Sequence, residues 1–473
     1  MQDELERLHT GVAALDAADP VWRRREDNYR GQQELPYAPE GVSEEYLDLR
    51  RQSIANWLST AMNVPVQRME MESVTDEDGK VDREAWRYMT SAQMHTRQRI
   101  LFSSMMVHGR AALSVTKTPA GARMAVENVR RVHFEPSPED PFTTSFVVKR
   151  WTEKKRQVSS LWTPPGSDIG DREFAVVYDE STCARFQKMS VGTLGEWKKV
   201  SETPHGLGAL PFVQIGSNVD ADNVPHAAID DLIEMQNACN TIRFNTLLAM
   251  QFSAFRQRVA TGYDPLLRDA SGDIVYMVGP DGEPLIGPDG QPVPVLRQGG
   301  KVGVDRMLVF PGSDTKVFDL DESNLDRYIT VYVRFLTDLF TKGQVPPQYA
   351  LDKMANLSGD AMAGADATLQ ALVADLQGEA AGGLDQAMQL MDRALGRQPL
   401  NREISWADRA PKSFGQIVDG VVKLVQGAGF PKRDAWDMLQ GATPNKVDSW
   451  MEHAAEEASD TWQAQLDAAV LGG

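Results

Sequence analysis

The residues best suited to chemistry are few in this sequence and stand far apart. The seven histidines are scattered singly, and no two have the helical spacing at which a pair binds a metal ion. Cys183 and Cys239 lack a Cys-x-x-Cys spacing, so they predict neither a disulfide framework nor a thiolate metal site, and they favour a reducing compartment. The sequence has no GxxxxGK phosphate loop, no GxGxxG after a strand, no HExxH and no GxSxG. We therefore expect no catalytic residue, no metal and no cofactor; a cytosolic α+β enzyme of unrecognised type is the alternative.

Two acidic stretches were tested as cation sites. If Gly79 took the invariant glycine position of a calcium loop, Val74 and Ala85 would fall at the first and twelfth ligand positions, where carboxylates are required. Residues 76–82 are therefore predicted to form a turn. The stretch GSNVDADN at residues 216–223 fits no ligand spacing, so we interpret it as an acidic linker.

Length and charge limit the possible classes further. A chain of 473 residues is too long for one compact core, so two or three domains are expected. The formal net charge of −18 argues against a protein that grips DNA by neutralising phosphates. It does not exclude a channel through which DNA passes, because an acidic wall repels phosphates, and the ordinary acidity of a soluble cytosolic protein is the alternative. The acidic start MQDELERLHT predicts no secretory signal, and no apolar run approaches the roughly 20 residues of a membrane span. These features predict a soluble protein.

A long helix is predicted at residues 226–257. Apolar residues follow a helical spacing along one arc, which shifts after Phe244; the first arc consists of Ile229, Leu232, Ile233, Cys239, Phe244 and Leu247. Gln236 and Asn240 lie within this arc, where buried amides need hydrogen-bond partners. The shift of the apolar face indicates that the helix passes from one packing environment into another.

Further helices are predicted in the C-terminal half. The second long helix covers residues 322–343, with an apolar stripe of Leu325, Ile329, Tyr332, Val333, Leu336 and Phe340. A loop stiffened by Pro346 and Pro347 follows, and a third long helix begins after Ser358. Its glycines, Gly364, Gly378, Gly382 and Gly383, predict a kink or a division. Residues 413–466 are again predicted to be helical.

The remaining segments alternate between helical and extended patterns. A helix is predicted at residues 44–63, a β-hairpin at 64–81 and a helix at 83–107. Residues 108–215 read as short strands between turn clusters, which predicts a β-rich domain. Between Gly262 and Lys316, GPDGEP and GPDGQP are two copies of one turn, flanked by short strands, so a small hairpin module is expected there.

The order of these elements resembles the portal (head–tail connector) proteins of tailed bacteriophages. DPVWRRREDNYRGQQELPY and NWLSTAMNVPVQRM resemble the opening of the family's peripheral wing, and GALPFVQIGSN precedes the first long helix, as in the family. IDDLIEMQNACNTIRFNTLLAMQFSAFRQRVATG and LDRYITVYVRFLTDLF are similar to its two stem helices, and KGQVPPQYALDKMANLSGDAM to its tunnel loop and crown helix. The doubled GPDG turn is not a feature of the family pattern.

The resemblance implies an α+β fold that is mainly α-helical, with long stem helices, a β-rich wing part and a small β-hairpin clip. The implied domains are a wing at 1–223, a first stem helix at 224–261, a clip at 262–318, a second stem helix at 319–342, a tunnel loop at 343–357 and a helical wing or crown region at 358–473. The expected stem-packing residues are Ile229, Leu232, Ile233, Asn240, Leu325, Ile329 and Leu336. The expected tunnel-loop residues facing DNA are Gln344, Pro346, Pro347, Gln348, Lys353 and Asn356.

The resemblance also implies a function. About twelve copies would form a homo-oligomeric ring at one capsid vertex, assembled in the host cytoplasm, through which double-stranded DNA enters during packaging and leaves during ejection. The implied partners are the terminase large subunit, the major capsid or scaffold protein and a head–tail adaptor, with no membrane. Another phage assembly or adaptor protein is a further alternative.

Overall fold

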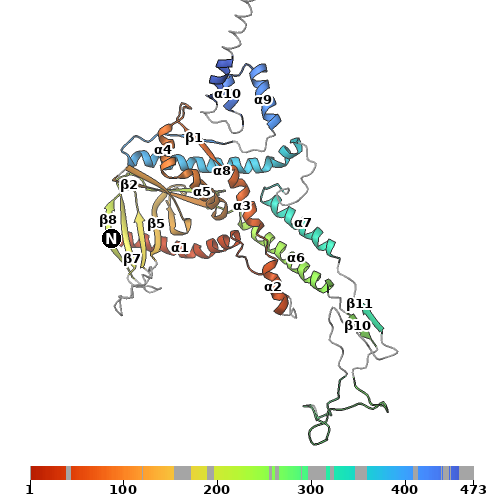
Figure 1. Ribbon diagram of the computed structural model, residues 1–473. Coiled ribbons are helices and arrows are strands. Elements are labelled where there is room, and N and C mark those ends of the chain that lie inside the picture. The colour runs from red at the N-terminus through yellow and green to blue at the C-terminus, as the bar shows by residue number, and fades with distance from the viewer. Residues whose placement is uncertain are drawn as a thin grey trace, which may run out of the picture. The chain divides into compact units, whose positions relative to one another are not determined.

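The computed structural model shows a chain of two compact units (Figure 1). The first unit comprises Met1–Arg30, Leu58–Leu232 and Phe340–Gly473, and the second comprises Gly31–Trp57 and Ile233–Leu339. The structure describes residues 2–38, 44–119, 121–153, 172–188, 196–254, 258–261, 266–288, 290–296, 316–319, 324–346, 359–407, 414–437, 439, 447 and 449–457. The predicted mixture of helix and sheet is confirmed.

The described residues of the first unit form three antiparallel sheets. The five-stranded sheet has the order β4 (Val132–Pro136), β5 (Thr144–Glu153), β6 (Arg172–Tyr178), β7 (Thr182–Lys188) and β8 (Trp197–Pro204). The three-stranded sheet has the order β3 (Gly121–Glu127), β2 (Arg110–Thr118) and β9 (Phe212–Gly216). β1 (Met71–Thr75) pairs with β12 (Glu403–Trp406), strands that are more than 300 residues apart in the sequence. The prediction of a β-rich region at 108–215 is confirmed.

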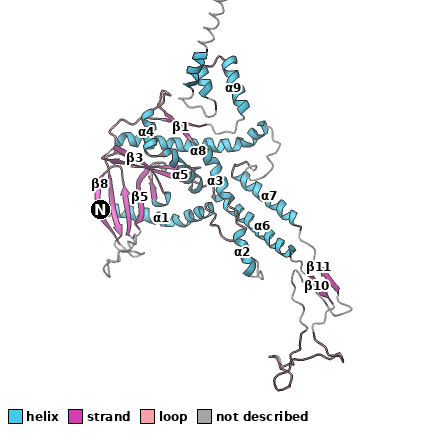
Figure 2. Ribbon diagram, in the orientation of Figure 1, coloured by secondary structure: helices cyan, strands magenta, loops and turns pink. Residues whose placement is uncertain are grey.

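Several helices pack on these sheets, among them α1 (Gln2–Tyr29) and α8 (Gly359–Ala394), and Figure 2 shows helices alongside the strands. α1 packs on β4, β5 and β6, where its buried Leu8 joins a core of Phe146, Val148, Ala175, Val177, Ala184 and Phe186. Gly11 permits this close approach, because a Cβ atom there would lie 2.4 Å from Cγ2 of Val148. α8 packs on β2, β3, β9 and β12.

The third long helix is not divided, because α8 is one continuous element of 36 residues, and a kink within it stays a prediction. Gly383 lies where α8 meets β9, and a Cβ atom there would lie 2.3 Å from Cγ1 of Ile215. Packing on the sheets therefore outweighs the cost of about 1 kcal/mol that glycine brings to a helix interior.

Three further predictions need correction. The hairpin predicted at 64–81 is wrong in its first half, because α3 (Trp57–Arg68) continues through the buried Val64 and Val66, and β1 takes β12 as its ladder partner. The turn predicted at residues 76–82 is confirmed, since Thr75 and Val81 form an antiparallel bridge across it. The helix predicted at 44–63 is two helices, α2 (Glu44–Gln52) and α3, separated by a non-helical segment. The helix predicted at 83–107 divides into α4 (Arg83–Ser91) and α5 (Met94–His108), because Gln93 takes a left-handed conformation with φ 56°.

The other elements of the first unit are short. A 3₁₀ helix, η1 (Val129–Arg131), precedes β4, and α9 (Phe414–Gly427) packs with α10 (Lys432–Asp437). α9 and α10 confirm part of the helical region predicted at residues 413–466.

The second unit contains most of the two predicted stem helices. α6 (Asp230–Ala254) and α7 (Leu325–Lys342) confirm both helices. β10 (Arg258–Thr261) pairs antiparallel with β11 (Lys316–Asp319), and residues 266–296 form tight turns joined by isolated bridges. α2 also belongs to this unit.

Candidate functional site

A buried amide pair holds the first predicted stem helix to the chain segment before α3. Gln236 and Asn240 are 0% and 1% exposed and lie one turn apart on α6. The Gln236 amide donates to the carbonyl of Ala55 and, at 2.9 Å, to Oδ1 of Asn240. The backbone N–H of Trp57 donates to Oε1 of Gln236 at 3.0 Å, and that of Ala55 donates to Oδ1 of Asn240 at 3.1 Å. The two side chains thus bond to backbone groups of Ala55 and Trp57 in the non-helical segment before α3.

More polar contacts extend this amide cluster. Nδ2 of Asn240 donates to Oε1 of the buried Gln33, and Nε of Arg243 donates to the carbonyl of Ser53 at 2.8 Å. Nε1 of Trp57 donates to the hydroxyl of Tyr332 on α7 at 2.7 Å. The prediction that the amides of α6 need partners is confirmed. These contacts also explain why no helix forms between α2 and α3, since backbone groups of Ala55 and Trp57 bond to side chains of α6.

The predicted stem-packing residues differ in their exposure. Ile229, Leu232, Ile233 and Leu336 are buried and Leu325 is half-buried, whereas Ile329 is 53% exposed. Val331 and Phe335 on α7 are also exposed. A surface groove of about 500 Å³ runs between the helices in the second unit, lined by Ile242, Asn245, Asn324, Arg327, Tyr328 and Val331. Contacts of these residues with another copy of the chain stay a prediction.

The predicted tunnel loop is described only at its start. Gln344 is exposed and takes a left-handed conformation with φ 56°, immediately after α7 ends at Lys342. The N–H of Val345 then donates to the carbonyl of Phe340 at 2.9 Å, and Val345 and Pro346 are buried. Pro347, Gln348, Lys353 and Asn356 lie outside the described residues. The chain therefore leaves α7 through a sharp, anchored turn.

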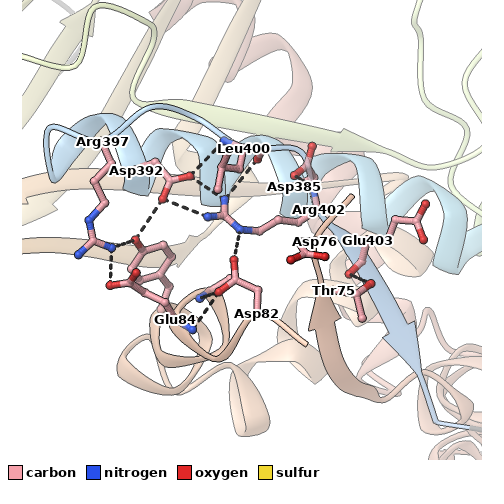
Figure 3. Close-up of polar contacts among 12 residues, drawn as sticks. Thr75, Asp76, Asp82, Glu84, Asp385, Asp392, Arg397, Leu400, Arg402 and Glu403 are labelled. Atoms are coloured by element: carbon pink, nitrogen blue, oxygen red, sulfur yellow. Dashed lines mark hydrogen bonds and ion pairs between the residues drawn. The ribbon is translucent and has the colours of Figure 1, made fainter. Parts of the chain in front are cut away.

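An ion network fixes the end of α8 to β12 and α4 in the first unit (Figure 3). Arg402, whose side chain is 3% exposed, donates to Oδ2 of Asp392 at 2.6 Å and, through Nε, to Oδ2 of Asp82 at 2.8 Å. The other carboxylate oxygen of Asp82 caps α4 by accepting the N–H groups of Glu84 and Ala85. Asp385 accepts the backbone N–H of Arg402 at 2.8 Å.

The network extends to the surface through Tyr88. Its hydroxyl donates to Asp392 at 3.1 Å and accepts from Arg397 at 2.8 Å, and Arg397 also pairs with Glu84. Burial tends to lower the pKa of Arg402, but hydrogen bonds to Asp392 and Asp82 raise it overall. Burial raises the pKa of Asp385, because its charged carboxylate is poorly hydrated there.

A second polar region surrounds the end of α5. The carbonyl of His108 accepts from Arg25 at 3.0 Å, and Arg25 also pairs with Asp230 at the start of α6. Burial lowers the pKa of His108 to about 4; Glu26 opposes this shift, while the arginines nearby, Arg25, Arg130 and Arg110, add to it. His108 lines a groove of about 490 Å³ between α1, α5 and η1. Its imidazole is therefore neutral at pH 7.

Sequence reasoning missed these ion networks. Arg68 pairs with Asp366 at 2.8 Å, and Arg402 pairs with Asp82, across about 300 residues of sequence. Nothing in the local pattern around either arginine marks its partner. Only the β1–β12 pairing brings residue 402 to α4, and that pairing has no sequence signal of its own.

The described residues lack groups typical of metal sites or membrane spans. Across them, no cluster of three or more His, Cys, Asp or Glu side chains could hold a metal ion. Within the same ranges, no helix is long and apolar enough to cross a membrane.

Comparison with known protein families gives one match that covers nearly the whole chain. Residues 22–467 match the family described as phage portal protein, SPP1 Gp6-like. A search of curated proteins finds no match. The family match includes α6, α7 and α8 as well as the sheets of the first unit.

Proposed function

The chain belongs to the phage portal protein family, SPP1 Gp6-like, and from that premise we propose that it forms the DNA conduit of a tailed bacteriophage. The observation that carries the proposal is the match over residues 22–467 of 473. Proteins of this family are generally structural rather than enzymatic, which supports a role for the chain as a component of the virion.

The proposed assembly is a closed ring of about twelve copies at one capsid vertex. Head-to-tail contacts close into a ring when each copy is rotated by a constant angle, and such contacts bring two different faces of the chain together. Three apolar residues of α7 are exposed, namely Ile329, Val331 and Phe335. They support this arrangement, because contact with a neighbouring copy would remove their side chains from water. α6 and α7 are the proposed stem.

Double-stranded DNA is the proposed cargo of the ring, entering during packaging and leaving during ejection. The net charge of −18 supports passage rather than binding, because an acidic wall repels phosphates and forms no deep electrostatic wells. Residues 343–356, which follow α7 in the sequence, contain one cationic residue, Lys353. We assign this loop to the narrowest part of the channel, where one weak cation per copy meets the phosphates.

The ring is also proposed to act as a docking platform. The terminase large subunit binds first and a head–tail adaptor later, through the clip at 262–318 and the stem, while the wing contacts the major capsid or scaffold protein. ATP hydrolysis belongs to the terminase, since this chain lacks a phosphate-binding loop.

The test is a packaging assay with procapsids assembled in the presence or absence of this chain. We expect DNA to enter only procapsids that contain it, and electron micrographs to show one labelled ring in each particle. Packaging that proceeds equally without the chain would contradict the proposal.

A further inference from the structure

The strand β9 forms an edge of the three-stranded sheet in the first unit. In the order β3, β2, β9 it pairs with β2 on one side, and the described residues supply no strand on its other side. The N–H of Val115 donates to the carbonyl of Pro211 at 2.8 Å, and the N–H of Ser217 donates to that of Gly109 at 2.7 Å. Bonded and non-bonded pairs alternate in an antiparallel ladder, so the odd-numbered residues of β9 make its bonds to β2.

The backbone groups of Phe212 and Gln214 therefore point away from β2. Each residue offers one N–H and one carbonyl on the free edge, and no described residue bonds to these groups. Phe212 is 8% exposed and Gln214 is half-buried, so their backbone groups lie at the bottom of a depression rather than on an open face. Such a row of unpaired donors and acceptors is a template for a further strand.

A groove of about 510 Å³ follows this edge. α8 lines it with Gln386, Gln389 and Arg393, and the chain at the start of β5 lines it with Phe142 and Thr144. The five residues of β9 span about 16 Å, which is enough for a short extended peptide. A helix bonds its own backbone groups, so only an extended segment can satisfy this edge.

The charge of the groove differs from that of the whole chain. No aspartate or glutamate is among its described lining residues, although the chain carries a formal net charge of −18. Arg393 is exposed, and in the described part of the chain it bonds only to the carbonyl of Gly208, at 3.5 Å, with no carboxylate beside it. Gly208 precedes β9, so this cation stands near the Phe212 end of the edge. A carboxylate at that end of a bound peptide would complement it.

We propose that β9 accepts an extended, acidic segment of another protein as a fourth strand of this sheet, with a carboxylate of that segment at Arg393. Backbone bonds to Phe212 and Gln214 hold the segment, and the side chains of the groove select its sequence. The inference rests on the proposed docking of another particle protein to the wing. It names the chemistry of that contact.

The first test titrates the full-length chain with a fluorescent synthetic peptide of alternating valine and threonine that ends in glutamate. Gln214→Pro removes an N–H from the free edge and no bond to β2, whereas the control Gln214→Ala keeps that N–H. We expect proline to weaken binding at least about fivefold and alanine less than about twofold, measured by fluorescence anisotropy. A wild-type chain that binds no peptide at millimolar concentration, or equal effects of the two variants, would overturn the inference.

The second test concerns the charge. Arg393→Gln should weaken binding of the glutamate peptide about two- to fivefold, because the contact is exposed to solvent. The same variant should leave binding of a matched peptide that ends in glutamine unchanged. Equal weakening of both peptides would overturn the assignment of a carboxylate to Arg393.

Amide hydrogen exchange gives a readout that needs no variant. Saturation of the wild-type chain with the glutamate peptide should slow exchange at Phe212 and Gln214 at least about tenfold. Val213 should slow less, since its N–H belongs to the ladder with β2 before the peptide binds. Unchanged exchange at Phe212 and Gln214 would show that the peptide adds no strand here.

Two further outcomes identify which proposal fails. Peptide binding that appears only after deletion of residues 458–473 would overturn this inference, because the chain's own terminus would then occupy the groove. Packaging that requires the chain, together with no peptide binding, would refute the inference and leave the proposed function intact. Peptide binding by a chain that packaging does not require would refute the proposed function and leave strand addition at β9 standing.

Discussion

Replacement of Arg402 by methionine is expected to destabilise the contact between β1 and β12 by about 3–5 kcal/mol. The side chains of Arg402 and Asp392 are 3% and 2% exposed, so removal of the guanidinium leaves a carboxylate with almost no access to water. Methionine keeps the apolar stem of the side chain, which limits the loss of packing. Asp392 retains only the hydroxyl of Tyr88 at 3.1 Å and the N–H of Leu400 at 3.4 Å.

Amide exchange of Val74 and Ile404, which are paired in the β1–β12 ladder, gives the local readout. The expected loss corresponds to an acceleration of about 100-fold to about 4,000-fold, since each 1.4 kcal/mol is a factor of ten. Arg397→Met is the matched control, because Arg397 belongs to the same network but its side chain is 45% exposed. A solvent-exposed ion pair contributes little to stability, so the control should accelerate exchange less than about fivefold.

A double variant completes the test. Arg402→Met combined with Asp392→Leu removes both buried charges, and the pair should lose less stability than the sum of the single changes, by about 1–3 kcal/mol. The reasoning is refuted if Arg402→Met accelerates exchange no more than Arg397→Met, or if the two single effects simply add.

Three more predictions follow. The folded pKa of His108, about 4, lies below its unfolded value of 6.5, so the neutral imidazole stabilises the folded chain above pH 6.5 and this stability is lost as pH falls. Between pH 7 and pH 5, the free energy of unfolding in urea should fall by about 2 kcal/mol more for wild type than for His108→Gln. Parallel pH profiles for the two proteins would contradict this. Lys353→Ala should leave ring assembly intact but alter DNA packaging or retention, and wild-type genome content for both this variant and a deletion of residues 348–353 would remove the tunnel-loop role. Free duplex DNA should bind the ring weakly and with little salt dependence, whereas tight binding that falls steeply between low and moderate salt would exclude a repulsive channel.

The sequence predicted the long helices well because their apolar spacing persists over many turns. It also indicated that Gln236 and Asn240 need partners, since amides inside an apolar arc cannot stay unbonded. It could not show that the partners are the backbone groups of Ala55 and Trp57, about 180 residues earlier. The helix predicted across 44–63 failed for the same reason: local propensity favours helix, while contacts with α6 favour an extended segment.

One hairpin and the long-range ion pairs could not be predicted from the sequence. The hairpin closed by the bridge between Arg268 and Ile274 shares only Gly272 with the two GPDG copies at the turn position, so its likeness to them is in backbone conformation rather than in side chains. Arg402 and Asp82 are 320 residues apart, and no periodic pattern connects them. Such contacts depend on strand pairing between distant segments, which composition and spacing do not encode.

Native mass spectrometry of the purified chain tests the central claim most directly, because a portal protein must close into a ring. The account predicts one dominant species with the mass of about twelve chains, stable on dilution. A chain that remains a monomer or dimer at every concentration would contradict it.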